Sequence, residues 1–189
     1  MNYINRYFCK ALLLLILCSF IAGGMAGCTF KTVRPEFVTA PPQKYSIAAV
    51  GNIVMEDKLW DYLIPHFRRG LVNGLLEQKA FEKVLDSVSE SLPESAILLS
   101  GKIYEVNKGS TALRWIVGFG AGKAKVRGVF EISGYDGKTL IRFETGQSYA
   151  GGAGIGGANY VDIEDLMQRL GKTVASQTVR WSRGEKVNE

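Results

Sequence analysis

The sequence predicts an α/β (α+β) domain: a mixed, largely antiparallel sheet of four to five strands with two main helices, preceded by a lipidated N-terminal tether. Three observations predict this class. A strand, a helix and a short strand follow one another early in the chain, a hairpin pattern surrounds residues 136–137, and the last long segment has apolar residues at helical spacing. We expect a signal peptide over 1–27, a tether over 28–44, one domain over 45–184 and a tail over 185–189.

The N-terminus has the layout of a cleavable export signal. Arg6 and Lys10 precede an apolar run, and small residues then lead to Cys28. The run is too short for a comfortable bilayer span, which needs about 20 residues. Residues 25–28, Met-Ala-Gly-Cys, resemble a bacterial lipobox, in which Cys28 receives a diacylglycerol group. By resemblance to enterobacterial sorting rules, Thr29 favours the outer membrane; ordinary secretion is the alternative.

Composition excludes several kinds of site. Cys9 and Cys18 lie in the signal, so the mature chain keeps only Cys28 and cannot form a disulfide or a thiolate metal site. His66 is the only histidine and is expected at the surface, and we expect no metal and no other cofactor. Without the two basic residues of the signal, 21 basic residues stand against 18 acidic ones. This mild excess argues against nucleic-acid binding.

The first elements are predicted in the order strand, helix, strand. Three prolines in segment 29–45 predict an extended tether. Residues 45–54 are apolar on both faces, as in a strand buried on each side. Apolar residues at helical spacing predict a helix from Leu59 to about Ala80, with Pro65 in its first turn or at a kink. Residues 81–85 resemble a short strand after that helix.

The next segment predicts a further strand and then a hairpin. Residues 96–106 form the strand. Residues 124–133 alternate apolar and polar side chains, and Asp136-Gly137 is a residue pair favoured in a tight hairpin turn. The partner strand continues the alternation, with apolar residues on one face and charged residues on the other: Ile141 and Phe143, then Arg142 and Glu144.

The last element is predicted to be a helix that begins near Asp162, whose carboxylate can accept hydrogen bonds from free amides. Glu164 and Asp165 suit its first turn, and Gly184 suits its end. Its inward stripe consists of Ile163, Leu166, Met167, Leu170, Val174 and Thr178.

Two glycine clusters are the candidates for a distinctive site. Within segment 114–123, glycine occupies every second position from 118 to 122. In an extended chain, Gly118, Gly120 and Gly122 would therefore share one bare face that a backbone or an aromatic ring could approach. The spacing fits neither a P-loop nor a dinucleotide fingerprint. We interpret the segment as a structural hairpin or packing loop, or as a partner- or membrane-contact loop. Segment 151–158 is typical of a mobile linker; alternatively, it packs against the first cluster or becomes ordered on binding.

Several of these motifs resemble those of the bacterial lipoprotein family catalogued as domain of unknown function 4410. The resemblance covers roughly residues 45–180, and it rests on Leu99–Ile103, Gly109-Ser110, Arg114 with 118–124, and Asp136–Lys138. That family has no established activity, so the resemblance implies no catalytic residue. A looser resemblance links the chain to small α/β domains of envelope lipoproteins that activate cell-wall synthases or build secretion channels.

The tether, the compact domain and the lack of reactive clusters predict a non-enzymatic outer-membrane lipoprotein that faces the periplasm and binds another envelope protein. Arg114, Trp115 and Phe119 are the predicted contact residues, and the three glycines between and after them shape the loop. The alternative is a self-assembling envelope component that uses the glycine-rich loops as subunit or membrane contacts. An enzyme would have to use carboxylates without help from histidine, such as Glu56, Asp57, Glu105 or Glu131.

Overall fold

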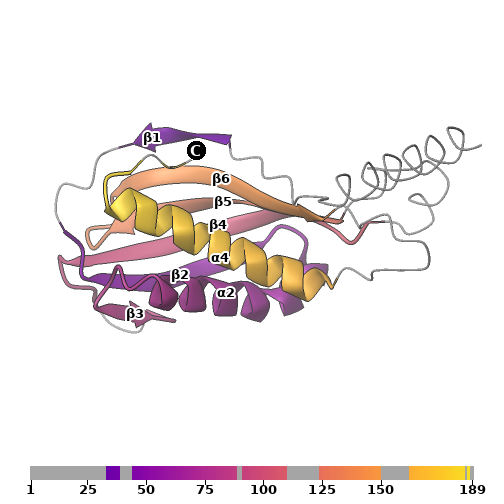
Figure 1. Cartoon of the computed structure of the whole chain (residues 1–189), viewed down its shortest axis with the longest axis horizontal. Coiled ribbons are helices and arrows are strands. Elements are labelled where there is room, and N and C mark those ends of the chain that lie inside the picture. Colours follow the sequence, from indigo (N-terminus) through magenta and orange to yellow (C-terminus); the bar gives the residue numbers. More distant parts are fainter. Residues whose placement is uncertain are drawn as a thin grey trace, which may run out of the picture.

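Six strands form one mixed sheet, and two α-helices cover one of its faces (Figure 1). The structure is a computed structural model, and it describes residues 33–38, 44–88, 91–109, 124–149, 162–185 and 187. The strand order is β1-β6-β5-β4-β2-β3; β2 is parallel to β3 and β4, and the other neighbouring pairs are antiparallel. This arrangement confirms the predicted fold class. The elements are β1 (Val33–Val38), β2 (Ile47–Met55), the 3-10 helix η1 (Lys58–Leu63), α2 (Ile64–Glu77), β3 (Lys83–Leu85), β4 (Ala96–Asn107), β5 (Ala124–Gly134), β6 (Thr139–Tyr149) and α4 (Ile163–Ser182).

Strand β1 lies within segment 28–44, which we expected to be a flexible tether. It pairs with β6 at the sheet edge and gives the sheet one strand more than the four to five expected. Pro35 lacks a backbone N–H, and an edge strand tolerates this loss. The register shifts between Val33 and Phe37, on either side of the proline. An edge strand that contains proline and an extended tether have similar sequence patterns, so the pattern could not separate them.

Strand β2 lies between β3 and β4, as its apolar pattern predicted, and Ala48, Ala49 and Val50 are fully buried. A bulge after Val50 shifts its register against β4. Arg68 of α2 donates hydrogen bonds to two carbonyl oxygens beside this bulge, to Gly51 at 2.9 Å and to Val50 at 3.2 Å. The guanidinium therefore satisfies backbone groups at the bulge and ties α2 to the sheet.

The helix predicted from Leu59 to about Ala80 is in fact two elements, η1 and α2. Asp57 caps η1, because its carboxylate accepts a 3.0 Å hydrogen bond from the Leu59 amide. Pro65 lies in the first turn of α2, where a missing N–H is tolerated. The proline thus marks the start of α2, and the residues before it form the tighter 3-10 helix.

The β5–β6 hairpin and the last helix form as predicted. Gly137 has a positive φ of 77°, and Asp136 accepts a 3.0 Å hydrogen bond from the Lys138 amide. Asp162 caps α4 through the Glu164 amide at 2.9 Å, and Gly184, with φ 74°, follows the helix end. The predicted inward stripe of α4 is buried throughout. None of the helices in the described ranges is long and apolar enough to cross a membrane.

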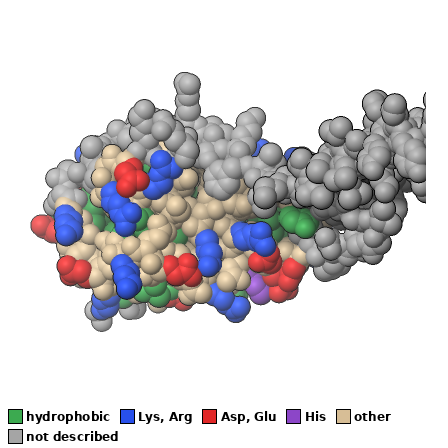
Figure 2. Space-filling view, in the orientation of Figure 1, with side chains coloured by type: hydrophobic (Ala, Val, Ile, Leu, Met, Phe, Trp, Pro, Cys, Tyr) green, Lys and Arg blue, Asp and Glu red, His purple; other side chains and the backbone are tan. Residues whose placement is uncertain are grey.

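Helices α2 and α4 touch through their backbones. A Cβ atom at Gly70 would overlap the carbonyl oxygen of Gln168, and one at Gly171 would overlap the carbonyl oxygen of Phe67. The close approach holds both helices against the same face of the sheet. Beneath them the ring of Phe67 stacks on Phe130, with centroids 5.3 Å apart and planes 4° apart. On the outer side of the helices, the side chains of the described residues mix Lys and Arg with Asp and Glu (Figure 2).

We expect Gly70→Val to lower the free energy of unfolding by about 3 kcal/mol, since the new side chain must push apart two backbones that cannot yield locally. Urea unfolding of the folded domain would measure the change. Asn73→Val is the matched control, because Asn73 is exposed on the same helix and its replacement loses only helix propensity, less than about 1 kcal/mol. Equal losses in the two variants would contradict the close contact.

Candidate functional site

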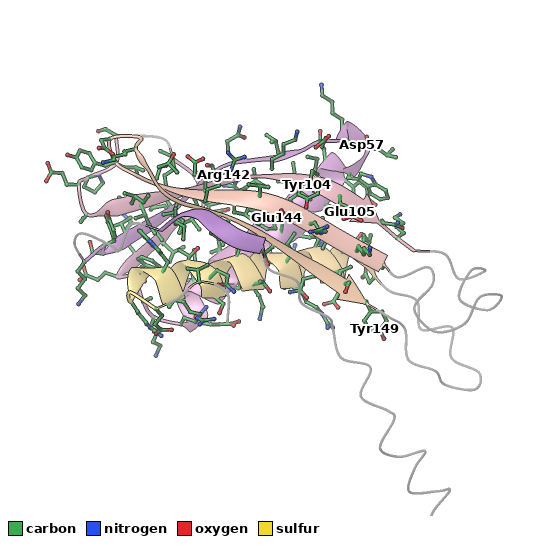
Figure 3. All side chains as sticks on the ribbon, turned by 90° about the horizontal axis from the view of Figure 1, so that it is seen from above. Asp57, Tyr104, Glu105, Arg142, Glu144 and Tyr149 are labelled. Carbon is green, nitrogen blue, oxygen red and sulfur yellow. The ribbon has the colours of Figure 1, made fainter. Side chains whose placement is uncertain are left out.

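The face of the sheet opposite the helices carries a charged cluster, here called the open-face cluster: Tyr104 and Glu105 of β4, Arg127 of β5 and Glu144 of β6. Figure 3 labels Tyr104, Glu105 and Glu144 of this cluster. Nη2 of Arg127 lies 2.7 Å from Oε1 of Glu144, and Nη1 lies 3.8 Å from Oε2 of Glu105. The Tyr104 hydroxyl donates a hydrogen bond to the same Glu144 oxygen. The guanidinium also lies 5.9 Å from the centre of the Tyr104 ring. One arginine therefore joins three strands.

Two local irregularities bring this cluster together. The register between β4 and β5 shifts between Ile103 and Glu105, so Tyr104 is an extra residue next to the glutamate. On the other side, Arg127 lies opposite Gly146, and a Cβ there would be 2.6 Å from Cγ of the arginine. The glycine leaves room for the arginine stem, and the guanidinium reaches diagonally to Glu144. The cluster thus depends on a bulge and on a missing side chain.

Burial, above all, raises the pKa of Tyr104 to about 12, and its hydrogen bond to Glu144 adds to the rise. The phenol is therefore protonated at neutral pH and acts as a donor. The ionic groups around it are between 23% and 33% exposed, and ion pairs with that much access to water contribute little net stability, about 0–1 kcal/mol each. The main effect of the cluster is to fix side-chain positions on this face.

A small cavity of about 240 Å³ lies beside the cluster, between η1 and the ends of β2 and β4. Tyr104 and Glu105 line it together with Met55, Asp57, Trp60, Ile103, Val106 and Asn107. The ammonium group of Lys108 lies 5.1 Å from the centre of the Trp60 ring, within the range of a cation–π contact. The cavity is at the loop end, by which we mean the end of the sheet where β4 stops at Asn107, β5 starts at Ala124 and β6 stops at Tyr149.

The site residues predicted from sequence lie outside the described residues. They are the lipidation residue Cys28, the contact residues Arg114, Trp115 and Phe119, and the loop-shaping glycines Gly118, Gly120 and Gly122. The structure does describe the ends of the strands to which the two glycine-rich segments connect. Segment 110–123 joins β4 to β5, and segment 150–161 joins β6 to α4, so both glycine clusters are attached at the loop end.

The four carboxylates considered for an enzyme are each held by a different partner. Glu56 pairs with Lys102 at 3.0 Å, Asp57 caps η1, and Glu105 pairs with Arg127. The fourth, Glu131, accepts a 2.7 Å hydrogen bond from the Thr139 hydroxyl.

His66, expected at the surface, has a quarter of its side chain exposed, with Nε2 3.5 Å from Oε2 of Glu164. No three of the described His, Cys, Asp and Glu residues gather closely enough to hold a metal ion.

Sequence reasoning did not single out Tyr104, Trp60 or the pairing of Arg127 with Glu144. The alternation of β5 and β6 does place Arg127 and Glu144 on the same polar face of the sheet. Predicting their ion pair also requires the register, which pairs Arg127 directly with Gly146 and puts Glu144 in the diagonal position. A glycine opposite an arginine on a polar face was therefore the available signal.

The raised pKa of Tyr104 predicts a pH-dependent contribution to stability. Its pKa in the folded protein is about 12, above the ordinary 10.0, so its stabilising effect is complete below pH 10 and is lost as the pH rises through 12. We expect the difference in unfolding free energy between the wild type and Tyr104→Phe to be constant below pH 10 and to fall between pH 10 and 12. Urea titrations at several pH values measure it, and a difference that stays constant to pH 12 would refute the assignment.

Comparison with known proteins finds a similar fold and a family that matches part of the chain. The chain is similar in structure to the PelC dodecamer from Paraburkholderia phytofirmans, with 12% identity, a TM-score of 0.50, and coverage of 85% of this chain and 99% of that one. A single-substitution variant of that dodecamer matches with 12% identity, the same coverage and a TM-score of 0.48. No curated protein sequence matches the chain. Residues 63–153, a narrower range than the 45–180 expected, match the family described as Domain of unknown function (DUF4410), which confirms the resemblance to that family found in the sequence.

Proposed function

We propose that this protein is a lipoprotein of the outer membrane that faces the periplasm and acts by binding another envelope protein at the loop end, without catalysis. One observation carries the proposal: several features that are separate in the sequence lie at that end of the sheet. They are η1, the cavity beside it, and the strand ends to which both glycine-rich segments are attached. Strand directions explain this, because β4 and β6 finish where β5 begins.

The direction of β1 supports lipid anchoring at the same end. Strand β1 runs antiparallel to β6, and Val33 pairs with Glu144, so the N-terminal end of β1 faces the end of the sheet at which β6 stops. Cys28 precedes Val33 by five residues, which span at most about 18 Å. A lipid on Cys28 would therefore hold the loop end close to the membrane.

The contact residues proposed for the partner are Arg114, Trp115 and Phe119, in the segment between β4 and β5. Arginine and aromatic residues dominate the binding energy of many protein interfaces. Their segment is attached to two neighbouring strands whose register the open-face cluster helps to fix through Glu105 and Arg127. A rigid base of this kind would position a binding loop without the help of catalytic groups.

Self-assembly is the second candidate, with the glycine-rich segments as subunit contacts. The structure with a TM-score of 0.50 to this chain is a dodecamer, and this observation favours the second candidate. In a closed ring each subunit presents two different surfaces, one to each neighbour. Here the sheet has two different edges, β1 on one side and the three-residue β3 on the other.

We expect Cys28→Ser to abolish lipid attachment, and with it the recovery of the protein in the membrane fraction. The thiol is the acceptor of the lipid, and a serine hydroxyl cannot replace it in the proposed modification. Mass spectrometry of the N-terminal peptide and fractionation of cells measure the two effects. Cys18→Ser is the matched control, since this cysteine lies inside the expected signal. Unmodified Cys28 in the wild-type protein would reject lipid anchoring.

We expect a photo-cross-linking residue at position 115 to capture a protein in living cells, and one at position 135 to capture none. Tyr135 is exposed in the turn between β5 and β6, at the opposite end of the sheet, and so provides the control. Mass spectrometry of the captured species decides between the candidates: a different envelope protein supports the first, and a second copy of this chain supports self-assembly. Equal capture from both positions, or none from position 115, would reject the loop end as the binding site.

A further inference from the structure

Helix η1 exposes an apolar face that the core does not use. A 3-10 helix has three residues per turn, so residues three apart lie on the same face. Trp60 and Leu63 form the inward face, and Leu63 is fully buried. Lys58 and Asp61 form an exposed polar face. The third face consists of Leu59 and Tyr62, which are 71% and 49% exposed, and we call it the η1 apolar face.

The η1 apolar face lies at the same end of the sheet as the start of β1. Helix η1 follows Met55, which closes β2, while β1 begins at Val33 on the opposite side of the sheet. The strand register puts Met55 and Val33 at nearly the same level along the strand direction. Across the sheet, Met55 is aligned in turn with Ile103, Gly128 and Thr145. The residue next to Thr145 is Glu144, which pairs with Val33. The start of β1 and the 3-10 helix that carries the η1 apolar face therefore lie at the same end of the sheet.

We propose that the η1 apolar face rests on the surface of the lipid bilayer. The inference rests on the proposed anchoring through Cys28, and it goes further by naming the side chains that meet the membrane and the orientation of the domain. The occupant is a lipid surface because the anchor brings that surface within about 18 Å of Val33, the reach of five extended residues. The proposed anchor therefore supplies a lipid surface at the end of the sheet where the η1 apolar face lies.

The chemistry of η1 and its neighbours suits the boundary between lipid and water. Tyr62 has an apolar ring and a polar hydroxyl, a combination enriched at membrane interfaces, and Leu59 can enter the acyl region. Lys58 is exposed next to them, where its ammonium can reach phosphate groups while its stem stays apolar. Asp57 and Asp61 together outnumber the lysine and leave the local charge negative, so apolar contact rather than charge attraction holds the face to the membrane. Two side chains bind weakly alone, but the anchor makes their binding intramolecular.

The test uses the full chain, expressed with its lipid and reconstituted into vesicles of phosphatidylethanolamine and phosphatidylglycerol. An environment-sensitive fluorophore, NBD maleimide, is attached to Leu59→Cys, and in a separate preparation to Tyr135→Cys. The second position is the matched control, because Tyr135 is as exposed as Tyr62 and lies at the opposite end of the sheet. We expect the emission from position 59 to shift to the blue on reconstitution and to be quenched by nitroxide-labelled lipids, and that from position 135 to do neither.

The alternatives give different results. Vesicles that float with the protein but leave position 59 unchanged would overturn the orientation and leave anchoring intact. Shifts at both positions would also overturn it, since they indicate nonspecific adsorption. A shift at position 59 in detergent, without lipid and dependent on protein concentration, would assign the face to a second copy of the chain. If the protein does not float, or if the parent chain takes up the dye at Cys28, anchoring fails and the inference fails with it.

Discussion

The close contact between α2 and α4 is the constraint on which the rest of the fold depends. At Gly70 and Gly171 the two backbones are nearer than side chains would allow, so two helices fit side by side on one face of the sheet. The aromatic contact between Phe67 and Phe130 follows from this placement. Phe130 needs space of its own, and it lies across Gly101 and Gly128, where a Cβ would meet its ring. Glycines thus determine the spacing of both layers of the domain.

Both helices lie on one face of the sheet. On the other face, interactions between side chains of the described residues hold neighbouring strands in position. Arg127 does this by joining Glu105 on one neighbouring strand to Glu144 on the next. The contribution of such exposed pairs to stability is small, so their value lies in geometry. They fix the part of the sheet from which the segment between β4 and β5 departs. The same strands carry the helices on one side and support the loop end at their tips, which links the core to the proposed binding surface.

Sequence patterns predicted those elements whose signal is local. The alternation around Asp136-Gly137 and the apolar stripe that starts at Ile163 correspond to the hairpin and to α4. Contacts between distant elements were not predictable, because a glycine in a helix, such as Gly70, looks merely unfavourable until its partner helix is known. The candidate site shows the same limit. The glycine clusters were recognisable by composition, but their attachment at one end of the sheet depends on the pairing of β4, β5 and β6.

The two proposals constrain each other through orientation. If a lipid on Cys28 and the η1 apolar face both meet the bilayer, every copy of the protein stands on the membrane by the same end. Copies that share one orientation can be related only by rotation about an axis perpendicular to the membrane, so any closed assembly would be cyclic. Anchoring also confines the copies to a surface, which raises their effective concentration and lets weak contacts suffice. A short edge strand such as β3 would therefore be an adequate subunit contact on a membrane, although it would be too small in solution.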